Sequence, residues 1–139
     1  MKFPYRPASI AKSEAFPQGL KLHRPIIRVT LKHRKQTLDI YGVVDSGADH
    51  CIFPSDAAQA LGLDPKLGKK GVMYGINRQP TEVFFHQIEI LISGRAIPVY
   101  AGFSDNCPPL LGQLGFFENF EVRLNFKRKE LELKTYPNK

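Results

Sequence analysis

The chain has 139 residues, which suffices for one domain with a core and is too short for two. Its hydrophobic fraction of 42% is ordinary for a globular protein, and no apolar run approaches the roughly 20 residues that span a bilayer. The start, from Met1 to Pro7, lacks the apolar stretch of a secretory signal, and two cysteines make no disulfide framework. We therefore expect a reduced, cytoplasmic protein without a membrane span, and not a disulfide-rich secreted domain.

The formal net charge of +7 is unevenly distributed along the chain. Residues 1–44 hold nine Lys or Arg against two acidic residues, whereas the remainder holds 11 basic and 11 acidic residues. Such an excess could attract RNA, DNA or an acidic membrane surface. No aromatic residues interleave with His33-Arg34-Lys35, as a base-stacking platform would need. We favour a solvated basic face and rank nucleic-acid binding by this segment last among the functions considered.

Residues 1–24 contain three prolines and a glycine that interrupt any periodic pattern. This composition predicts an extended arm or partly ordered leader. The domain itself is expected to cover residues 25–139.

Period-two alternation predicts short strands through the rest of the chain. In the first of them, Ile27, Val29 and Leu31 lie on one face and polar residues on the other. The expected strands cover residues 26–32, 37–44, 51–53, 71–76, 81–92, 95–101, 121–126 and 130–135. The pattern predicts an all-β domain that is closed or strongly curled, so that its strand edges are covered.

Two short helices are expected between these strands. The first runs from Asp56 to Leu61, with Ser55 as its N-cap and Gly62 as its C-cap. The second runs from Gln113 to about Phe120. Neither helix changes the all-β class.

The segment Asp45-Ser46-Gly47-Ala48 follows a predicted strand, which would deliver an acid into a tight turn. Gly47 lacks a Cβ, so backbone can pass close to the acid, and the Ser46 hydroxyl can brace the loop. Such a triplet is also common in ordinary turns. About 65 positions later comes Leu110-Leu111-Gly112, and a predicted hairpin with its tip near residues 77–80 lies between the two.

Over residues 24–136, these motifs resemble the retropepsin-like aspartic proteases. The resemblance implies a closed acid-protease barrel, in which Asp45 is the catalytic aspartate and the hairpin is a flap with its tip at residues 75–79. It implies that Ser46, Gly47 and Ala48 support the active-site loop. The residues that it places around a bound peptide are Asp49, Gly75, Ile76, Asn77, Leu110, Leu111 and Gly112.

Two features depart from the retroviral pattern. Gln113 stands where those members usually have an Arg that pairs with an acid at the position of Asp49. We therefore do not expect that ion pair to brace a dimer. The flap tip, from Gly75 to Gln79, is also poorer in glycine than retroviral tips.

Aspartic peptidases need two carboxylates that share a proton, and this chain has a single Asp-Ser-Gly motif. We expect a second copy to supply the other carboxylate in a two-fold homodimer. A water held between the two Asp45 side chains would then hydrolyse a peptide or protein substrate without a cofactor or metal. The alternative is the same fold as a peptide-binding or dimerisation module with little or no turnover.

A Cys/His peptidase is the other catalytic chemistry considered. His50 and Cys51 are adjacent, and neighbouring strand residues point to opposite faces, so the two would not meet as base and nucleophile. We expect Cys51 and Cys107 to be structural thiols. The four histidines show no zinc-site spacing.

Overall fold

The computed structural model describes residues 1–137. In this part of the chain, no helix has the length and apolar character that crossing a membrane would require. The described elements are β1 (Lys2–Pro4), β2 (Arg6–Ile10), β3 (Leu20–Arg24), β4 (Ile26–His33), β5 (Gln36–Val44), β6 (Ile52–Pro54), α1 (Ser55–Ala60), the 3-10 helix η1 (Pro65–Leu67), β7 (Lys69–Tyr74), β8 (Pro80–Ile92), β9 (Arg95–Ser104), β10 (Leu110–Leu111), β11 (Phe120–Asn125) and β12 (Glu130–Thr135).

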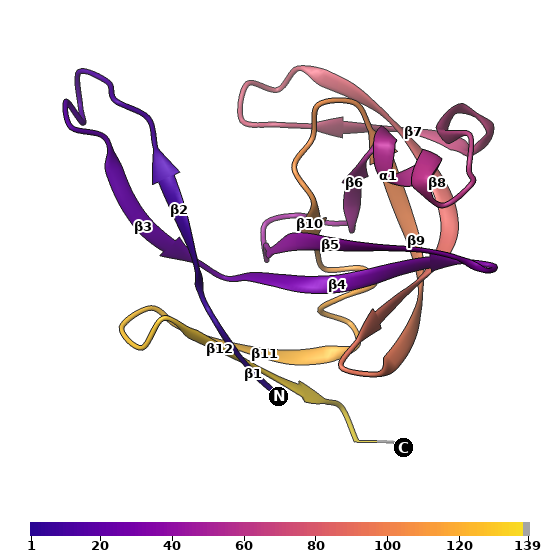
Figure 1. Cartoon of the computed structure of the whole chain (residues 1–139). Helices are drawn as coiled ribbons and strands as arrows, with labels where there is room; N and C mark the ends of the chain where they lie inside the picture. Colours follow the sequence, from indigo (N-terminus) through magenta and orange to yellow (C-terminus); the bar gives the residue numbers. More distant parts are fainter. Residues whose placement is uncertain (138–139) are drawn as a thin grey trace.

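The main sheet is a ring of strands that closes on itself (Figure 1). Its order is β4-β5-β10-β6-β9-β8-β7, and an additional pairing of β4 with β8 joins the two sides. The long β8–β9 hairpin pairs from Phe84 with Phe103 to Ile92 with Arg95. Closure removes most open strand edges, which is the physical reason that short strands can form a stable domain. The predicted all-β, closed fold is confirmed.

Side chains that alternate along the strands of this ring fill most of the core, and Phe120, Leu131 and Leu133 of β11 and β12 complete it from outside the ring. On β4, Ile27, Val29 and Leu31 are buried as predicted. The largest fully buried side chains elsewhere include four phenylalanines, at positions 53, 103, 116 and 120. The helix α1 turns Ala57 and Ala58 toward the core, and their small side chains allow it to pack closely.

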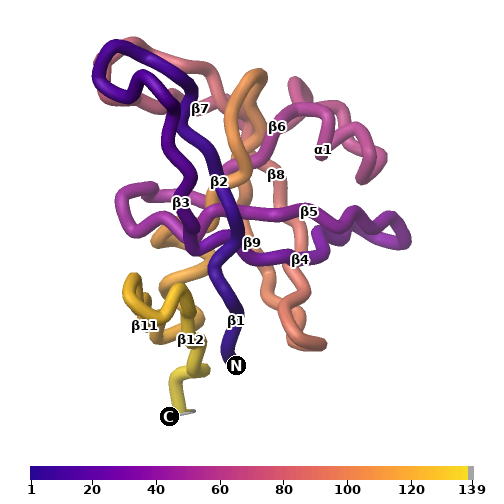
Figure 2. Tube along the Cα trace, turned by 60° about the vertical axis from the view of Figure 1, so that its left-hand side comes forward, coloured from indigo at the N-terminus to yellow at the C-terminus, as the bar shows by residue number. Residues whose placement is uncertain are grey.

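A smaller sheet joins the two ends of the described chain. Its order is β1-β12-β11, and β1 pairs antiparallel with β12, with Phe3 opposite Leu131. Beyond β1, the chain forms the β2–β3 hairpin, a separate two-stranded sheet that extends away from the ring (Figures 1 and 2). The segment expected to be an extended arm is therefore largely strand. Its separation from a domain over residues 25–139 stays a prediction.

The predicted helix over residues 113–120 is wrong, because this segment consists of turns. Gly115 has a φ of +98°, which lies outside the helical region. Its neighbour Leu114 forms an isolated parallel β-bridge with His50. The Leu114 backbone is therefore paired with a distant segment and does not form helical hydrogen bonds. The turns still bury Phe116 and Phe120. Apolar spacing alone did not distinguish packed turns from a helix.

The predicted N-cap of α1 is also wrong. Pro54 occupies the N-cap position with an extended backbone and no side-chain cap, and Ser55 is the first helical residue. At the other end, Leu61 is the C-cap and Gly62 follows it with a φ of +73°. That left-handed conformation suits glycine and ends the helix one residue earlier than predicted.

Candidate active site

Asp45 lies directly after β5, at the point where a parallel pairing with β10 ends. Val43 and Val44 pair with Leu110 and Leu111 in that register. The Asp45 N–H donates to the Leu111 carbonyl, with an N···O distance of 3.0 Å. The acid is therefore attached to two strands that are far apart in the sequence.

The turn that follows directs the carboxylate. The Gly47 N–H donates to Asp45 Oδ1 at 2.8 Å, and the Ala48 N–H donates to the Asp45 carbonyl at 3.2 Å. A Cβ on Gly47 would lie 3.2 Å from the same Oδ1, which is a tight contact. Ser46 is exposed at the outside of the turn. The small Gly47 thus lets a backbone N–H reach the acid while leaving its other oxygen open.

Gly112 allows β10 to cross close beside this turn. A Cβ at Gly112 would lie 2.3 Å from the His50 carbonyl oxygen and 2.6 Å from that of Ala48, so no side chain fits. Just after this crossing, the N–H groups of Gln113 and Leu114 donate to the carbonyls of Ala48 and Asp49, at 2.8 and 2.9 Å. The second motif therefore serves as a backbone brace for the first.

Gln113 adds a side-chain contact to this brace. Its Nε2 donates to the Ser46 carbonyl at 2.8 Å. Asp49, the acid that an Arg would pair with, is exposed and has no ion-pair partner among residues 1–137. The glutamine thus ties down the turn within one chain and leaves the Asp49 carboxylate available.

A cleft of about 650 Å³ lies between the Asp45 turn and the β7–β8 hairpin. Seven of the predicted site residues line it: Asp45, Gly47, Ala48, Asp49, Gly75, Ile76 and Leu110. The other four predicted site residues do not line the cleft. Leu111 and Gly112 are buried behind the turn, Ser46 faces solvent, and Asn77 is at the hairpin tip. The lining residues that the motifs did not reveal are His50, Ile52, Val72, Met73 and Tyr74.

The hairpin over the cleft presents apolar side chains to solvent. Val72, Tyr74 and Ile76 alternate along β7 and the tip, and Ile76 is fully exposed. Met73 between them is apolar as well, so the sequence shows an apolar run here, and only the structure shows which of its side chains are exposed. The tip is held by two hydrogen bonds, from the Arg78 N–H to the Gly75 carbonyl at 3.0 Å and from the Gln79 N–H to Asn77 Oδ1 at 3.0 Å. An exposed apolar hairpin above a cleft is suited to close over an apolar segment.

The cysteine beside the cleft is not activated. Burial raises the pKa of the Cys51 thiol to about 11, and its Sγ donates to the Leu114 carbonyl at 3.5 Å. The neighbouring His50 ring packs edge-on against Phe85, with 5.0 Å between centroids. Burial likewise raises the pKa of the Cys107 thiol. A buried thiol with a raised pKa is a poor nucleophile at neutral pH.

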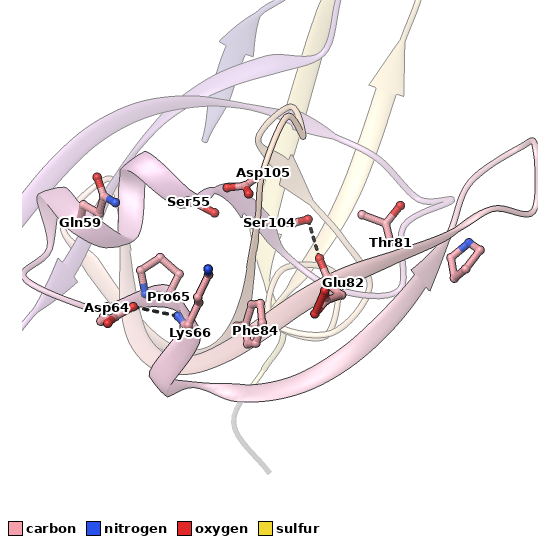
Figure 3. A pocket seen from close by; sticks show the side chains of 11 residues that line it. Ser55, Gln59, Asp64, Pro65, Lys66, Thr81, Glu82, Phe84, Ser104 and Asp105 are labelled. Carbon is pink, nitrogen blue, oxygen red and sulfur yellow. Dashed lines mark hydrogen bonds between the residues drawn. The ribbon is translucent and has the colours of Figure 1, made fainter.

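A second hollow, of about 720 Å³, lies between α1, η1 and the start of β8 (Figure 3). Several of its polar groups already have partners: Asp64 Oδ1 accepts from the Lys66 N–H at 3.1 Å, and Ser104 Oγ donates to the Glu82 carbonyl at 2.7 Å. The Glu82 carboxylate lies 3.3 Å from Lys70 Nζ. Because it shares no lining residue with the Asp45 cleft, this hollow is separate from the candidate site.

Comparison with solved structures identifies the architecture. The chain matches a structure titled "EIAV protease complexed with the inhibitor HBY-793" with a TM-score of 0.53 and 22% identity, over 65% of this chain and 82% of that one. It also matches a retropepsin-like aspartic protease from Rickettsia conorii with a TM-score of 0.56 and 21% identity, over 90% and 96%. The chain therefore has a retropepsin-like fold. No protein-family model and no curated protein matches its sequence.

Proposed function

We propose that this chain is an aspartic endopeptidase that acts as a homodimer. The observation that carries the proposal is the Asp45 turn, which presents an oriented carboxylate at the base of a cleft under an apolar hairpin. The retropepsin-like fold supports the same assignment.

The chemistry needs a second carboxylate. In an aspartic peptidase, one ionised carboxylate takes a proton from the attacking water, and a protonated one donates to the substrate carbonyl. The cleft of one chain contains Asp45 and also Asp49, but only Asp45 receives the Gly47 N–H and is braced by Leu111. An isologous dimer would bring two Asp45 turns together across one water. Neither a metal nor a covalent intermediate takes part in this reaction.

The substrate would be an extended peptide or an unfolded segment of a protein. A strand placed between the β7–β8 hairpin and the Asp45 turn would bond through its backbone, since peptide backbones commonly add to strand edges. Ile52, Val72, Tyr74, Ile76 and Leu110 would favour apolar side chains near the scissile bond. Besides Asp45 itself, the charged or polar exceptions in the cleft are Asp49 and His50.

Digestion of a peptide library from acid to neutral pH, with and without a statine-type inhibitor, tests the proposal. The wild-type chain is expected to cleave, the inhibitor to block cleavage, and Asp45→Asn to abolish it without loss of fold. Asp105→Asn, the same chemical change at an exposed aspartate that does not line the cleft, is the matched control and should retain cleavage. Hydrolysis that survives Asp45→Asn would reject the assignment.

A peptide-binding or dimerisation module without turnover is the second candidate. The observation that favours it is the departure at Gln113, together with a hairpin tip held by its own hydrogen bonds. Binding of library peptides without any cleaved product at any pH would support the module over the enzyme.

A further inference from the structure

The β2–β3 hairpin, residues 6–24, is here called the hairpin arm. Within residues 1–137 its two strands pair only with each other. The arm is fixed at its base, where Tyr5 is buried and donates its N–H to the Lys129 carbonyl at 2.7 Å, and where the Arg6 guanidinium lies 4.2 Å from the centre of the Tyr41 ring. Its loop is also ordered, since Ser13 and Phe16 exchange hydrogen bonds. The arm is therefore an ordered hairpin that is attached to the rest of the chain at its base.

One face of the arm is apolar. The register places Ala8 opposite Leu22 and Ile10 opposite Leu20, so these four side chains share a face because alternate strand residues point the same way. None of them packs against the hydrophobic core; Leu20 is 42% exposed, and Ala8, Ile10 and Leu22 are half-buried. A two-stranded hairpin is only marginally stable on its own in water. The apolar face is therefore suited to be covered by a partner.

The position of the arm indicates which partner. In Figure 1 the arm extends on the same side of the molecule as the turn between β5 and β6, which carries Asp45, and as the tip between β7 and β8. Turning that side forward brings the arm to the front in Figure 2. The arm therefore lies on the side of the molecule that a second copy would have to face in order to bring its own Asp45 turn to this one.

The charges on that side are complementary. Arg24 lies at the base of the arm, opposite Arg6 and on the same face as Leu20 and Leu22. It is exposed, and no acidic group of residues 1–137 forms an ion pair with it. On the cleft side, the exposed Asp49 likewise has no cation within ion-pair distance in the described chain. In a two-fold pair, each copy could supply the charge that the other lacks.

We propose that the hairpin arm docks through its apolar face onto a second copy of this chain and holds the shared Asp45 site together. The inference rests on the proposed function, because the single Asp45 of each chain is what requires the second copy. The arm would then replace the Arg–Asp brace that Gln113 rules out.

Sedimentation velocity of the full chain across a range of concentrations tests the arm. In the variant Ile10→Thr/Leu20→Thr, the apolar pair becomes polar while strand propensity is kept. We expect its dimer dissociation constant to rise about tenfold or more, since burial of two large apolar side chains would be lost. Peptide cleavage should fall at low protein concentration and recover at high concentration.

The matched control is Ser9→Thr/Lys21→Thr, which places the same threonine pair at cross-strand neighbours on the opposite face of the arm. We expect it to dimerise like the wild type. Circular dichroism and thermal unfolding should be alike for both variants, because neither touches the core.

The outcomes separate the two proposals. If Ile10→Thr/Leu20→Thr dimerises as tightly as the wild type, the apolar face has another occupant and the arm inference is overturned, while the peptidase proposal stands. If the variant dissociates but the wild-type dimer cleaves nothing, the arm inference is supported and the peptidase proposal fails. Cleavage by a strictly monomeric wild type overturns both.

Discussion

Backbone hydrogen bonds fix Asp45 through both its main chain and its carboxylate. Leu111 accepts from its N–H, and the Gly47 N–H holds one carboxylate oxygen. The other oxygen remains for water or for a carboxylate partner. This arrangement orients the acid before any substrate binds, which is what a preorganised site requires.

Gln113 is the residue that we expect to matter most to this orientation outside the motif itself. Gln113→Leu would remove the bond to the Ser46 carbonyl, worth about 1 kcal/mol, and loosen the turn. We expect kcat to fall several-fold to about tenfold, with a smaller change in KM. Peptide cleavage kinetics measure both, and Gln87→Leu on the exposed side of β8 is the matched control. An unchanged kcat would show that the backbone bonds of Gln113 and Leu114 hold the turn without the side chain.

Cys51 gives the fold a pH dependence at the alkaline end. Burial raises its pKa from 9.0 to about 11, so the unfolded chain loses this proton first as the pH rises. Ionisation of Cys51 therefore leaves the free energy of unfolding unchanged below about pH 9 and lowers it as the pH rises from 9 to 11. The loss at pH 10 is about 1 kcal/mol. Urea unfolding of the wild type and of Cys51→Ala at pH 8 and pH 10 measures the difference. Equal losses in the two proteins would contradict the assignment, since Cys107 is present in both.

At the scale of elements, β10 carries the first two residues of the Leu110-Leu111-Gly112 motif and joins this motif to the Asp45 turn. Its two residues pair with β5, and Leu110 also pairs with Ile52 of β6, although more than 50 positions separate β10 from either strand. Gly112 permits this crossing, and Gly42 on β5 permits another close approach, because a Cβ there would lie 3.0 Å from Leu111 Cγ. The site therefore depends on a two-residue strand whose close packing is permitted by Gly112 and Gly42.

Gly112→Ala tests this dependence. A methyl group 2.3 Å from the His50 carbonyl oxygen cannot be accommodated without moving backbone, so we expect a loss of about 3 kcal/mol or more in the free energy of unfolding. Gly75→Ala is the control, because its Cβ would meet nothing closer than 3.7 Å. Thermal and denaturant unfolding compare the two variants. Equal stability of Gly112→Ala and wild type would mean that β10 can shift without cost.

Local sequence patterns predicted the strands in which apolar and polar residues alternate. They failed where hydrogen bonds to backbone far away in the sequence determine the conformation. Ile27, Val29 and Leu31 identified β4, and the motif residues Asp45 and Leu110 both line the cleft on the side opposite the β7–β8 hairpin. The turns around Gly115 were mistaken for a helix, because the N–H groups of Gln113 and Leu114 donate to the distant Asp45 turn, a contact that the local sequence does not show. The pairing of β1 with β12 brings together residues about 130 positions apart, which no local pattern reports.

At the scale of the whole molecule, the features converge on one side. The Asp45 turn, the tip between β7 and β8, and the hairpin arm all face the same way (Figure 1). One chain supplies one Asp45 carboxylate, one exposed apolar hairpin and one two-stranded sheet that pairs with no other strand among residues 1–137. In the dimer that we propose, a two-fold pair would complete all of them with a single surface, because an isologous interface uses the same patch of both copies.

Subunit mixing is the most direct test of the claim that two Asp45 residues form one site. Wild-type chain and Asp45→Asn are unfolded together in equal amounts and refolded, and peptide cleavage is compared with that of the same total amount of wild type. If each site needs Asp45 from both copies, only the wild-type pairs are active and activity falls to about one quarter. If each chain carries its own site, activity falls only to about one half, and that result would contradict the account.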